Sequence, residues 1–345
     1  MIRCVVAMLE LSAPHRPTNL FSPSHSSLAC QTRPSQRKKE VCNVYSSHFV
    51  SLVIVCSRSG LALCWVLLAM TLAAKAQTQA ACTFNFFSPT TPFKLPDGTP
   101  VFIQPIGIND FGTIVGYSSP GKARGLIRWA NGGVTRVKGT SRLFARNDHG
   151  TSVGFDLTGQ GILVNGSTIT PIILDVNNAG IKEVRGINRW GTIVGRYRLP
   201  NNFGARAFKR WNTGTTHTLN FPGAAFTGPI GINDNGTVVG AAGADHGFIF
   251  HNGQWATLDY PGAQAPGFTN LVGITNAGKI IGNALSATDL STTTFLYENG
   301  TFKVISVPNS VPGSASLRSI SPKQGLILGV TDVATGSSAF IAQCQ

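Results

Sequence analysis

The stretch Gly107-Ile-Asn-Asp-Phe-Gly112-Thr-Ile-Val-Gly116 decides the fold, because it returns along the chain at a regular interval. Its six copies place their central glycines 38, 41, 45, 42 and 47 residues apart. A period in the forties that is built from short strands is typical of a propeller or a solenoid. The copies begin at Gly107, Ala145, Gly186, Gly231, Gly273 and Ser319, and the second and the last are the most diverged.

One repeat contains four short strands separated by turn-forming residues. In residues 229–262, runs at 229–233, 237–241, 247–251 and 254–260 have strand composition. The turns Asp234-Asn-Gly236 and Asn252-Gly253 supply the positive φ that tight hairpins need. Four antiparallel strands per repeat predict the blade of a β-propeller. The chain is therefore expected to be all-β: a six-bladed β-propeller of four-stranded antiparallel blades, closed by an N-terminal strand.

The two ends of the repeat region predict how the ring closes. The last copy stops after its third strand, and residues 82–89 resemble the missing fourth strand. We expect this segment to complete the last blade and leave no open sheet edge. Cys82 and Cys344 would then lie side by side, and a disulfide between them would replace the missing hairpin turn. A lipidated Cys82 is the alternative, because Ala80-Ala81-Cys82 resembles the end of a lipobox.

The first 76 residues carry no repeat and indicate an exported protein. An apolar stretch of 14 residues, 61–74, is followed by the small-x-small cleavage signal Ala74-Lys75-Ala76. This length suits a signal-peptide core and is short for a membrane span, which needs ~20 residues. We predict a disordered or mis-annotated extension at 1–57, a signal peptide at 58–76 and one propeller domain at 77–345. A cytoplasmic extension on a signal anchor is the alternative.

Cleavage after Ala76 changes the cysteine and charge inventory. Of seven cysteines only Cys82 and Cys344 remain, as expected for a disulfide in an oxidising compartment. Residues 77–345 keep 20 Lys+Arg and 12 Asp+Glu, and 15 of the basic residues lie between Lys122 and Arg210. One half of the ring is therefore expected to be basic. The predicted location is secreted, with the periplasm or the cell surface as alternatives and no membrane span in the mature chain.

The repeat resembles the bacterial extracellular HAF-repeat family, which is named for a His-Ala-Phe triplet on the third strand. The Gly-Ile-Asn-Asp-x-Gly-x-Ile-Val-Gly phrase carries the resemblance over roughly residues 100–345. In this chain the triplet becomes Arg206-Ala207-Phe208, His246-Gly247-Phe248 or Ser338-Ala339-Phe340, and only His246 keeps the histidine. The resemblance implies a secreted propeller-like protein and implies no particular activity.

Loop lengths predict which face of the propeller binds a ligand. Turns between strands one and two, and between three and four, are uniformly tight, whereas links between strands two and three vary. Varied polar loops on a rigid scaffold are where binding usually resides. That face and the central funnel form the predicted site. The residues predicted there are Lys122, Arg124, Arg196, Arg198, Arg206, Asp245, His246 and Asp289.

The charges in this set predict the class of ligand. Its basic members fit an anionic ligand such as an acidic polysaccharide, and a cell-surface protein is a second kind of partner. A solvated basic rim without a specific partner is the alternative. Asp245 and Asp289, on adjacent repeats, are a candidate general acid/base pair for a propeller glycosidase. Nucleic acid is not expected, because the basic residues are not interleaved with aromatic ones.

Metal, cofactor and nucleophile motifs are absent from the sequence. The Asn109-Asp110, Asn147-Asp148 and Asn233-Asp234 pairs lack calcium-loop spacing, so a turn-forming role is expected for them. There is no nucleophile elbow, phosphate loop or dinucleotide fingerprint. We predict a monomeric binding or interaction module without metal or cofactor. An extracellular carbohydrate-active hydrolase or lyase that uses the funnel is the alternative, and a structural matrix protein is a third possibility.

Overall fold

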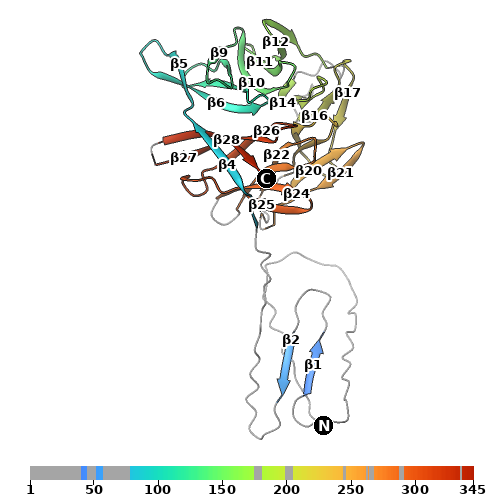
Figure 1. Ribbon diagram of the computed structural model, residues 1–345. Helices are drawn as coiled ribbons and strands as arrows, with labels where there is room; N and C mark the ends of the chain where they lie inside the picture. Colours follow the sequence, from blue (N-terminus) through green and yellow to red (C-terminus); the bar gives the residue numbers. More distant parts are fainter. Residues whose placement is uncertain are drawn as a thin grey trace, which may run out of the picture. The chain divides into compact units, whose positions relative to one another are not determined.

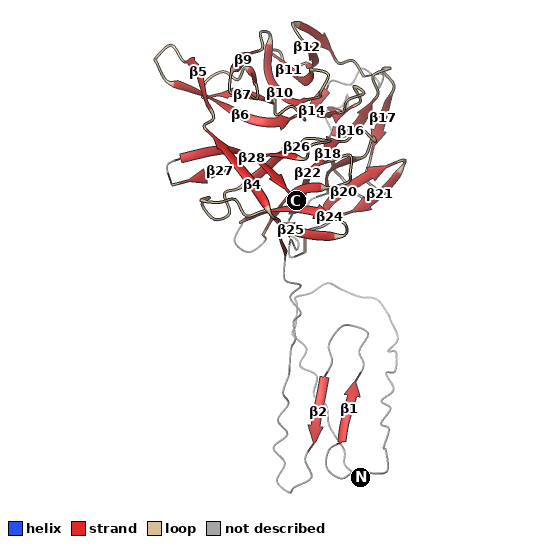
Figure 2. Ribbon diagram, in the orientation of Figure 1, coloured by secondary structure: helices blue, strands red, loops and turns tan. Residues whose placement is uncertain are grey.

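The computed structural model describes residues 40–44, 52–56, 78–174, 181–198, 205–243, 246–261, 263, 268–286, 291–334 and 336–345. These residues form strands and no helix (Figure 2). The chain divides into two compact units, residues 1–75 and 76–345. The first unit contains the antiparallel pair β1 (Glu40–Val44) and β2 (Leu52–Cys56). The predicted signal peptide at 58–76 lies outside the described residues. In the described parts, no helix has the length and apolar character that a membrane span requires.

The second unit is a six-bladed β-propeller, as the repeat predicts (Figure 1). The first blade contains β5 (Thr90–Lys94), β6 (Pro100–Ile108), β7 (Ile114–Ser119), β8 (Gly125–Arg128) and β9 (Val134–Arg136). The second contains β10 (Thr140–Arg146), β11 (Thr151–Asp156), β12 (Gly161–Asn165) and β13 (Thr168–Pro171). The third contains β14 (Ile181–Ile187), β15 (Ile193–Arg198), β16 (Ala205–Arg210) and β17 (Thr216–Leu219).

The remaining three blades complete the ring. The fourth contains β18 (Thr227–Ile232), β19 (Val238–Ala242), β20 (His246–His251) and β21 (Gln254–Thr257). The fifth contains β22 (Phe268–Ile274), β23 (Ile280–Leu285), β24 (Thr292–Glu298), β25 (Thr301–Val304) and the short β3 (Thr78–Gln79). The sixth contains β26 (Ser316–Ile320), β27 (Leu326–Val333), β28 (Gly336–Cys344) and β4 (Cys82–Phe87). Two blades therefore carry a fifth strand, β5 or β3, beyond the predicted four.

The N-terminal segment closes the ring in the predicted way. Strand β4 pairs antiparallel with β28 (Figure 1). In the register of this pair, Cys82 stands opposite Cys344. The two cysteines form a disulfide. Just before β4, the short β3 pairs parallel with β25 of the fifth blade, and Ala80 is buried in the core between the fifth and sixth blades. The segment thus joins two blades: its pairing with β28 of the sixth blade was predicted, whereas its pairing with β25 of the fifth blade was not.

The hydrophobic core lies between the blades. Each innermost strand contacts the innermost strands of both neighbours, and β26 of the last blade contacts β6 of the first. Six apolar clusters fill the six interfaces between adjacent blades. The phenylalanines of the triplet position on the third strand are the largest fully buried side chains: Phe208, Phe248, Phe295 and Phe340. Their burial explains why an apolar residue recurs at this position of the repeat.

The first glycine of the repeated phrase lets neighbouring inner strands approach closely. A Cβ atom at Gly107 would lie 2.5 Å from the Phe144 carbonyl oxygen in the second blade. A Cβ atom at Gly231 would lie 2.9 Å from the Gly273 Cα atom in the fifth. Side chains at these positions would push the blades apart at the centre of the ring, where six strands meet. The glycine is therefore needed for the close approach of inner strands in the four copies that have it, whereas the second and sixth copies have Ala145 and Ser319 there.

In the first four copies of the phrase, the asparagine links its blade to the next one. Asn147 Nδ2 donates to the Asn188 carbonyl at 3.0 Å, Asn188 Nδ2 to the Asn233 carbonyl at 3.1 Å, and Asn233 Nδ2 to the Thr275 carbonyl at 2.9 Å. Each Oδ1 atom accepts from its own turn, as Asn188 does from the Thr192 amide at 3.0 Å. All of these asparagines are buried. The side chain therefore closes its own turn and fastens the adjacent blade at once.

The aspartate of the phrase also joins blades. The Asp110 amide donates to Asp148 Oδ1 at 3.1 Å, and the Arg189 amide donates to Asp234 Oδ1 at 2.9 Å. Asp110 Oδ1 in turn accepts from the amides of Lys323 and Gln324 in the last blade, each at 2.8 Å. The Asn-Asp-x-Gly turn therefore fastens blades, a role beyond the predicted turn formation.

Candidate functional site

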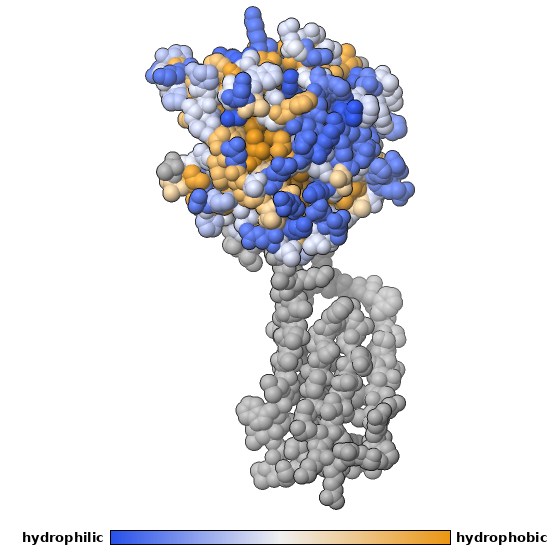
Figure 3. Space-filling view, in the orientation of Figure 1, coloured by the Kyte–Doolittle hydropathy of each residue, from blue (hydrophilic) through white to orange (hydrophobic). Residues whose placement is uncertain are grey.

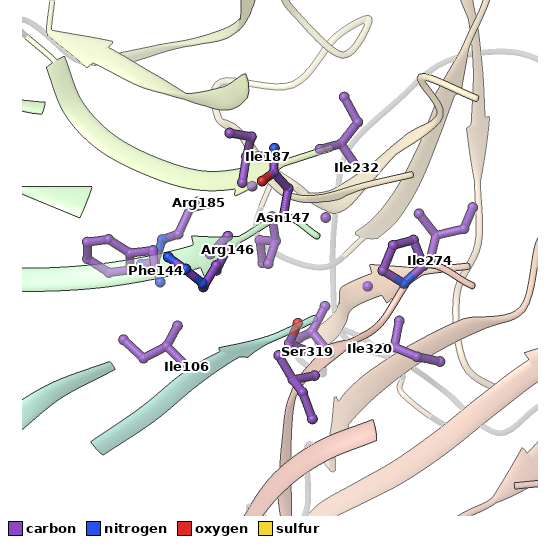
Figure 4. A pocket seen from close by; sticks show the side chains of 18 of the residues that line it. Ile106, Phe144, Arg146, Asn147, Arg185, Ile187, Ile232, Ile274, Ser319 and Ile320 are labelled. Atoms are coloured by element: carbon purple, nitrogen blue, oxygen red, sulfur yellow. The ribbon is translucent and has the colours of Figure 1, made fainter. Parts of the chain in front are cut away.

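The six innermost strands surround a central channel with two compartments. The wider compartment has a volume of about 330 Å³ and the narrower one about 70 Å³. Both are lined by Ile106, Phe144, Arg185, Ile230 and Val272, so they are continuous parts of one channel. The narrower compartment ends at the ring of first turns, and its wall includes Asn147 and Asp148 (Figure 4).

Three rings of side chains line the channel because inner strands alternate their faces. The inner ring, near the first turns, consists of Ile108, Arg146, Ile187, Ile232, Ile274 and Ile320. The middle ring consists of Ile106, Phe144, Arg185, Ile230, Val272 and Arg318. The entrance compartment is completed by Gln104, Arg142, Asn270 and Ser316 from the starts of inner strands, and by Tyr117 and Asn283 from second strands. These starts lie on the face that carries the variable loops.

The wide compartment is positively charged. Arg142, Arg185 and Arg318 line it, and the described part of its lining includes no carboxylate. Arg142 lies over the Tyr117 ring, with its guanidinium carbon 4.8 Å from the ring centroid. Arg185 lies 5.2 Å from the centroid of the Phe144 ring, and both side chains are seen together in Figure 4. Two of the three guanidinium groups are therefore oriented by aromatic rings of the channel wall.

Arg318 has no ion-pair partner among the described residues. Its side chain is exposed to the channel, yet the surrounding blades displace water around it. This partial loss of hydration lowers the pKa of Arg318 below its ordinary value. Tyr117 acts in the opposite direction and Arg185 in the same direction, so both lie near the Arg318 guanidinium. An anion at this position would replace the lost hydration of the cation.

Glu183 neutralises one edge of the entrance. Arg196 Nε donates to Glu183 Oε2 at 2.6 Å, and Arg185 also forms an ion pair with the same carboxylate. Burial acts to raise the pKa of Glu183, but the charges of Arg185 and Arg196 outweigh it and hold the pKa below its ordinary value. Glu183 is thus ionised at neutral pH and fixes Arg185 beside the cavity. Arg142 and Arg318 are the two arginines of this compartment that have no ion-pair partner among the described residues.

Polar side chains also line the wide compartment, and one of them, Asn283, is hydrogen-bonded to the backbone of the sixth blade. Asn283 Nδ2 donates to the Leu317 carbonyl at 2.9 Å, and the Leu317 amide donates to Asn283 Oδ1 at 2.8 Å. This pair of hydrogen bonds joins the fifth blade to the sixth at the entrance. Gln104, Asn270 and Ser316 also line this compartment. The compartment therefore offers amide and hydroxyl groups in addition to its arginines.

The described members of the predicted site are not part of the lining of the cavity. Lys122 is exposed on the loop after β7, and Arg124 Nη1 donates to the Ala123 carbonyl at 3.0 Å. Arg206 is exposed at the start of β16. Arg196 is hydrogen-bonded to Glu183 at the entrance. Arg198 is the last residue of β15, and its side chain is not among the described ones. Asp245 and Asp289 lie outside the described residues.

His246 is engaged with a carboxylate. Its Nδ1 atom lies 2.7 Å from Asp259 Oδ2, and the Gly247 amide donates to Asp259 Oδ1 at 3.0 Å. The histidine side chain is half exposed. It is not part of the channel lining.

Sequence reasoning missed the three arginines of the wide compartment, although the repeat contains a signal for two of them. Arg185 and Arg318 directly precede the first residue of the repeated phrase, where the other copies have Ile106, Phe144, Ile230 or Val272. A charged residue at an otherwise apolar position of a repeat points to a role other than packing. Arg142 lies two residues before Phe144, where the other copies have Gln104, Glu183, Gly228, Asn270 or Ser316, so the repeat gives no such signal for it.

The described residues contain no group of three or more His, Cys, Asp or Glu side chains placed to hold a metal ion. Figure 3 shows hydrophobic surface gathered near the middle of the visible face, next to a broad hydrophilic area. The channel has the same mixed character, with an isoleucine-rich inner ring and a polar, cationic entrance. The chemistry that the channel offers is therefore anion binding at its wide end.

Solved structures similar to this chain include propeller enzymes. An oligogalacturonate lyase from Vibrio parahaemolyticus aligns over 77% of this chain and 98% of its own, with 10% identity and a TM-score of 0.47. An oligogalacturonate lyase in complex with manganese aligns over 78% and 98%, with 8% identity and a TM-score of 0.46. A Trypanosoma rangeli sialidase aligns over 76% and 60%, with 10% identity and a TM-score of 0.39. No protein-family model and no curated protein matches the chain.

Proposed function

We propose that this protein is a binding module whose wide channel compartment holds the anionic group of an acidic saccharide. The observation that carries this proposal is the convergence of Arg142, Arg185 and Arg318 on one cavity whose described lining has no carboxylate. Guanidinium groups bind carboxylates through paired, charge-assisted hydrogen bonds. Partial desolvation inside the channel makes these interactions stronger than they would be on the rim.

The shape and the remaining groups of the compartment support a carboxylated sugar. Its volume of about 330 Å³ lies within the range of small-molecule sites, ~300–1,000 Å³. The amide and hydroxyl groups of Gln104, Asn270 and Ser316, which line the same compartment, can hydrogen-bond to sugar hydroxyls. Arg206, which is exposed at the start of β16, would then contact further anionic units of the saccharide outside the cavity.

We also propose that the protein acts outside the cytoplasm. The Cys82–Cys344 disulfide supports this location, because such bonds persist in oxidising compartments. The apolar segment at 61–74 and the small-x-small signal after it support export by a signal peptide. N-terminal sequencing of the mature protein tests this point, and a mature chain that begins well before residue 58 would contradict it.

Binding is tested by calorimetry with uronic-acid oligosaccharides and neutral oligosaccharides of the same length. We expect uronate binding that weakens with salt, and loss of about 10-fold or more in affinity for Arg318→Gln, because a charged hydrogen bond contributes ~1.5–3 kcal/mol. Lys122→Gln is the matched control, since it removes the same charge outside the cavity. Equal losses in both variants would place binding on the rim, and equal affinity for neutral sugars would contradict the proposal.

The alternative of a hydrolase requires two carboxyl groups beside the scissile bond. The described lining of the wide compartment supplies none, and the two carboxylates of the narrower compartment, Asp148 and Asp234, accept hydrogen bonds from turns of neighbouring blades. The predicted pair Asp245 and Asp289 lies outside the described residues. The same incubations should therefore be examined for released products, with Asp245→Asn and Asp289→Asn as the variants that test a hydrolase.

A further inference from the structure

We propose that the channel entrance also cleaves its saccharide, as a lyase for uronic-acid glycans in which Tyr117 is the catalytic acid and base. This inference rests on the proposed binding of a uronate carboxylate by the channel arginines. It commits the site to β-elimination, a reaction that needs a carboxylate receptor and one proton-transferring group, and that needs no pair of protein carboxylates.

Tyr117 has the position that this reaction requires. It lines the same compartment as Arg142 and Arg318. The Arg142 guanidinium lies over its ring at 4.8 Å from the centroid, so the two side chains are held together. Tyr117 is close enough to Arg318 to act on it electrostatically. A carboxylate bound by the two arginines would therefore lie next to a phenol oxygen.

Chain topology fixes these groups in a rigid frame. Tyr117 lies on β7, where it pairs with Gln104 of β6 and with Gly125 of β8. Arg142 is on β10 of the next blade, and Arg318 is on β26 of the previous blade. The phenol thus comes from the first blade, and the two guanidinium groups reach the cavity from the blades on either side. Sites on paired strands hold their geometry better than sites on loops.

The chemistry follows from the charges. A uronate carboxylate bound by Arg142 and Arg318 has its negative charge compensated, which makes the adjacent C5–H bond of the sugar more acidic. The Tyr117 oxygen, as phenolate, takes the C5 proton. The electron pair of that bond forms the C4=C5 double bond, and the C4–O4 bond breaks. Tyr117 then gives its proton to the departing O4 oxygen, which restores the phenolate, so no oxidant or reductant is consumed.

The test is an assay of the full-length protein on a panel of uronic-acid polysaccharides, with and without added divalent cations. The readout is ultraviolet absorbance of the conjugated C4=C5 double bond, together with calorimetric affinity for a uronate oligosaccharide. We expect unsaturated products from the wild type. Tyr117→Phe should lower turnover by about 100-fold or more, the range of general acid–base catalysis, while affinity changes little because the ring remains beneath Arg142.

The matched control is Tyr297→Phe, which removes a phenol oxygen from a tyrosine that packs on Phe302 in the fifth blade. It should leave turnover and affinity unchanged. Arg318→Gln should lower both, because it removes the carboxylate receptor. Uronate binding by the wild type without any unsaturated product would overturn the lyase and leave the binding module intact. Saturated products, or full turnover by Tyr117→Phe, would overturn the role of Tyr117, and absence of uronate binding would overturn both proposals.

Discussion

At the scale of single residues, the second position of the Asn-Asp-x-Gly turn determines which polar side chains meet between neighbouring blades. The fourth and fifth blades use an aspartate and an asparagine: the Asp234 amide donates to Asn276 Oδ1 at 2.9 Å, and Asn276 Nδ2 donates to Asp234 Oδ2 at 2.8 Å. The first and second blades use two aspartates, Asp110 and Asp148, and Asp110 Oδ2 is buried without a hydrogen-bond partner. The second arrangement is therefore the less favourable one.

This difference predicts a pH-dependent stability. Burial raises the pKa of Asp148 above its ordinary value of 3.8, and the Asp110 carboxyl adds to the rise. Folding therefore favours protonated Asp148, so its stabilising contribution is complete below pH 3.8 and is lost as pH rises through the raised pKa. Asp148→Asn removes the titrating group, and with it the loss of stability at higher pH. Its amide also supplies a hydrogen-bond donor for Asp110. We expect the variant to be more stable than the wild type at neutral pH, with a smaller difference in acid.

Denaturant unfolding across the pH range measures this effect. Asn276→Asp is the matched reversal, because it places two aspartates between the fourth and fifth blades and should lower stability at neutral pH. The pKa values of the two carboxyl groups in the first pair shift in opposite directions. Burial alone would raise the pKa of Asp110, but hydrogen bonds to its carboxylate, chiefly from the Gln324 amide, outweigh the effect of burial and lower that pKa. A stability gain for Asp148→Asn that is the same at every pH would contradict the argument.

At the scale of secondary-structure elements, the N-terminal strand β4 supports the whole last blade. It covers the edge of β28 along the register from Ala339 to Cys344. Phe84 and Phe340 contact each other with ring centroids 5.6 Å apart, which adds side-chain packing to the backbone pairing. The disulfide then links the ends of the two strands. An uncovered β28 would expose a row of unpaired backbone groups.

The disulfide therefore has a predictable contribution to stability. It closes a loop with a sequence separation of 262 residues. Reduction, or the double change Cys82→Ser and Cys344→Ser, should lower the free energy of unfolding by up to about 5 kcal/mol in the chain-entropy model. Denaturant midpoints with and without reductant measure this. The serine variant should be insensitive to reductant, and an unchanged midpoint for the reduced wild type would show that the bond contributes nothing.

At the scale of the whole molecule, the ring depends on the asparagines that connect successive blades. Asn188 is 3% exposed and connects the third blade to the fourth through the Asn233 carbonyl. In the fifth copy Thr275 takes the asparagine's place and keeps only the bond within its turn, in which its Oγ1 accepts from the Lys279 amide at 3.0 Å. The ring therefore contains both the full and the partial arrangement.

Removal of one asparagine side chain should weaken the entire ring. Asn188→Ala leaves buried backbone groups without partners, and each such group costs about 1–3 kcal/mol. Asn188→Thr should cost less, because a threonine can still close the turn as Thr275 does. A single cooperative transition shifted to lower denaturant is expected, and an equal loss for both variants would show that the bond between blades is unimportant.

The sequence by itself determined the blade count, the strand order and the closing disulfide. Each depends on local features that repeat: turn residues that need positive φ, such as Gly112 at +71°, and apolar residues with strand spacing. Cys82 and Cys344 could be paired because strand register follows directly from the repeat. The fifth strands β3 and β5 were not predicted, since their pairing depends on backbone edges that only the folded ring presents.

The tertiary structure alone decided which side chains share the channel. Arg142, Arg185 and Arg318 are up to 176 residues apart, on three different blades, and they meet only when six inner strands form a ring. The bulge in each inner strand, as between Leu143 and Ala145, also changes which side chains face the channel. The sequence pattern shows which loops vary in length. Only the packing of the blades around one axis brings the three arginines to the centre, where the surrounding strands exclude part of the water from their charges.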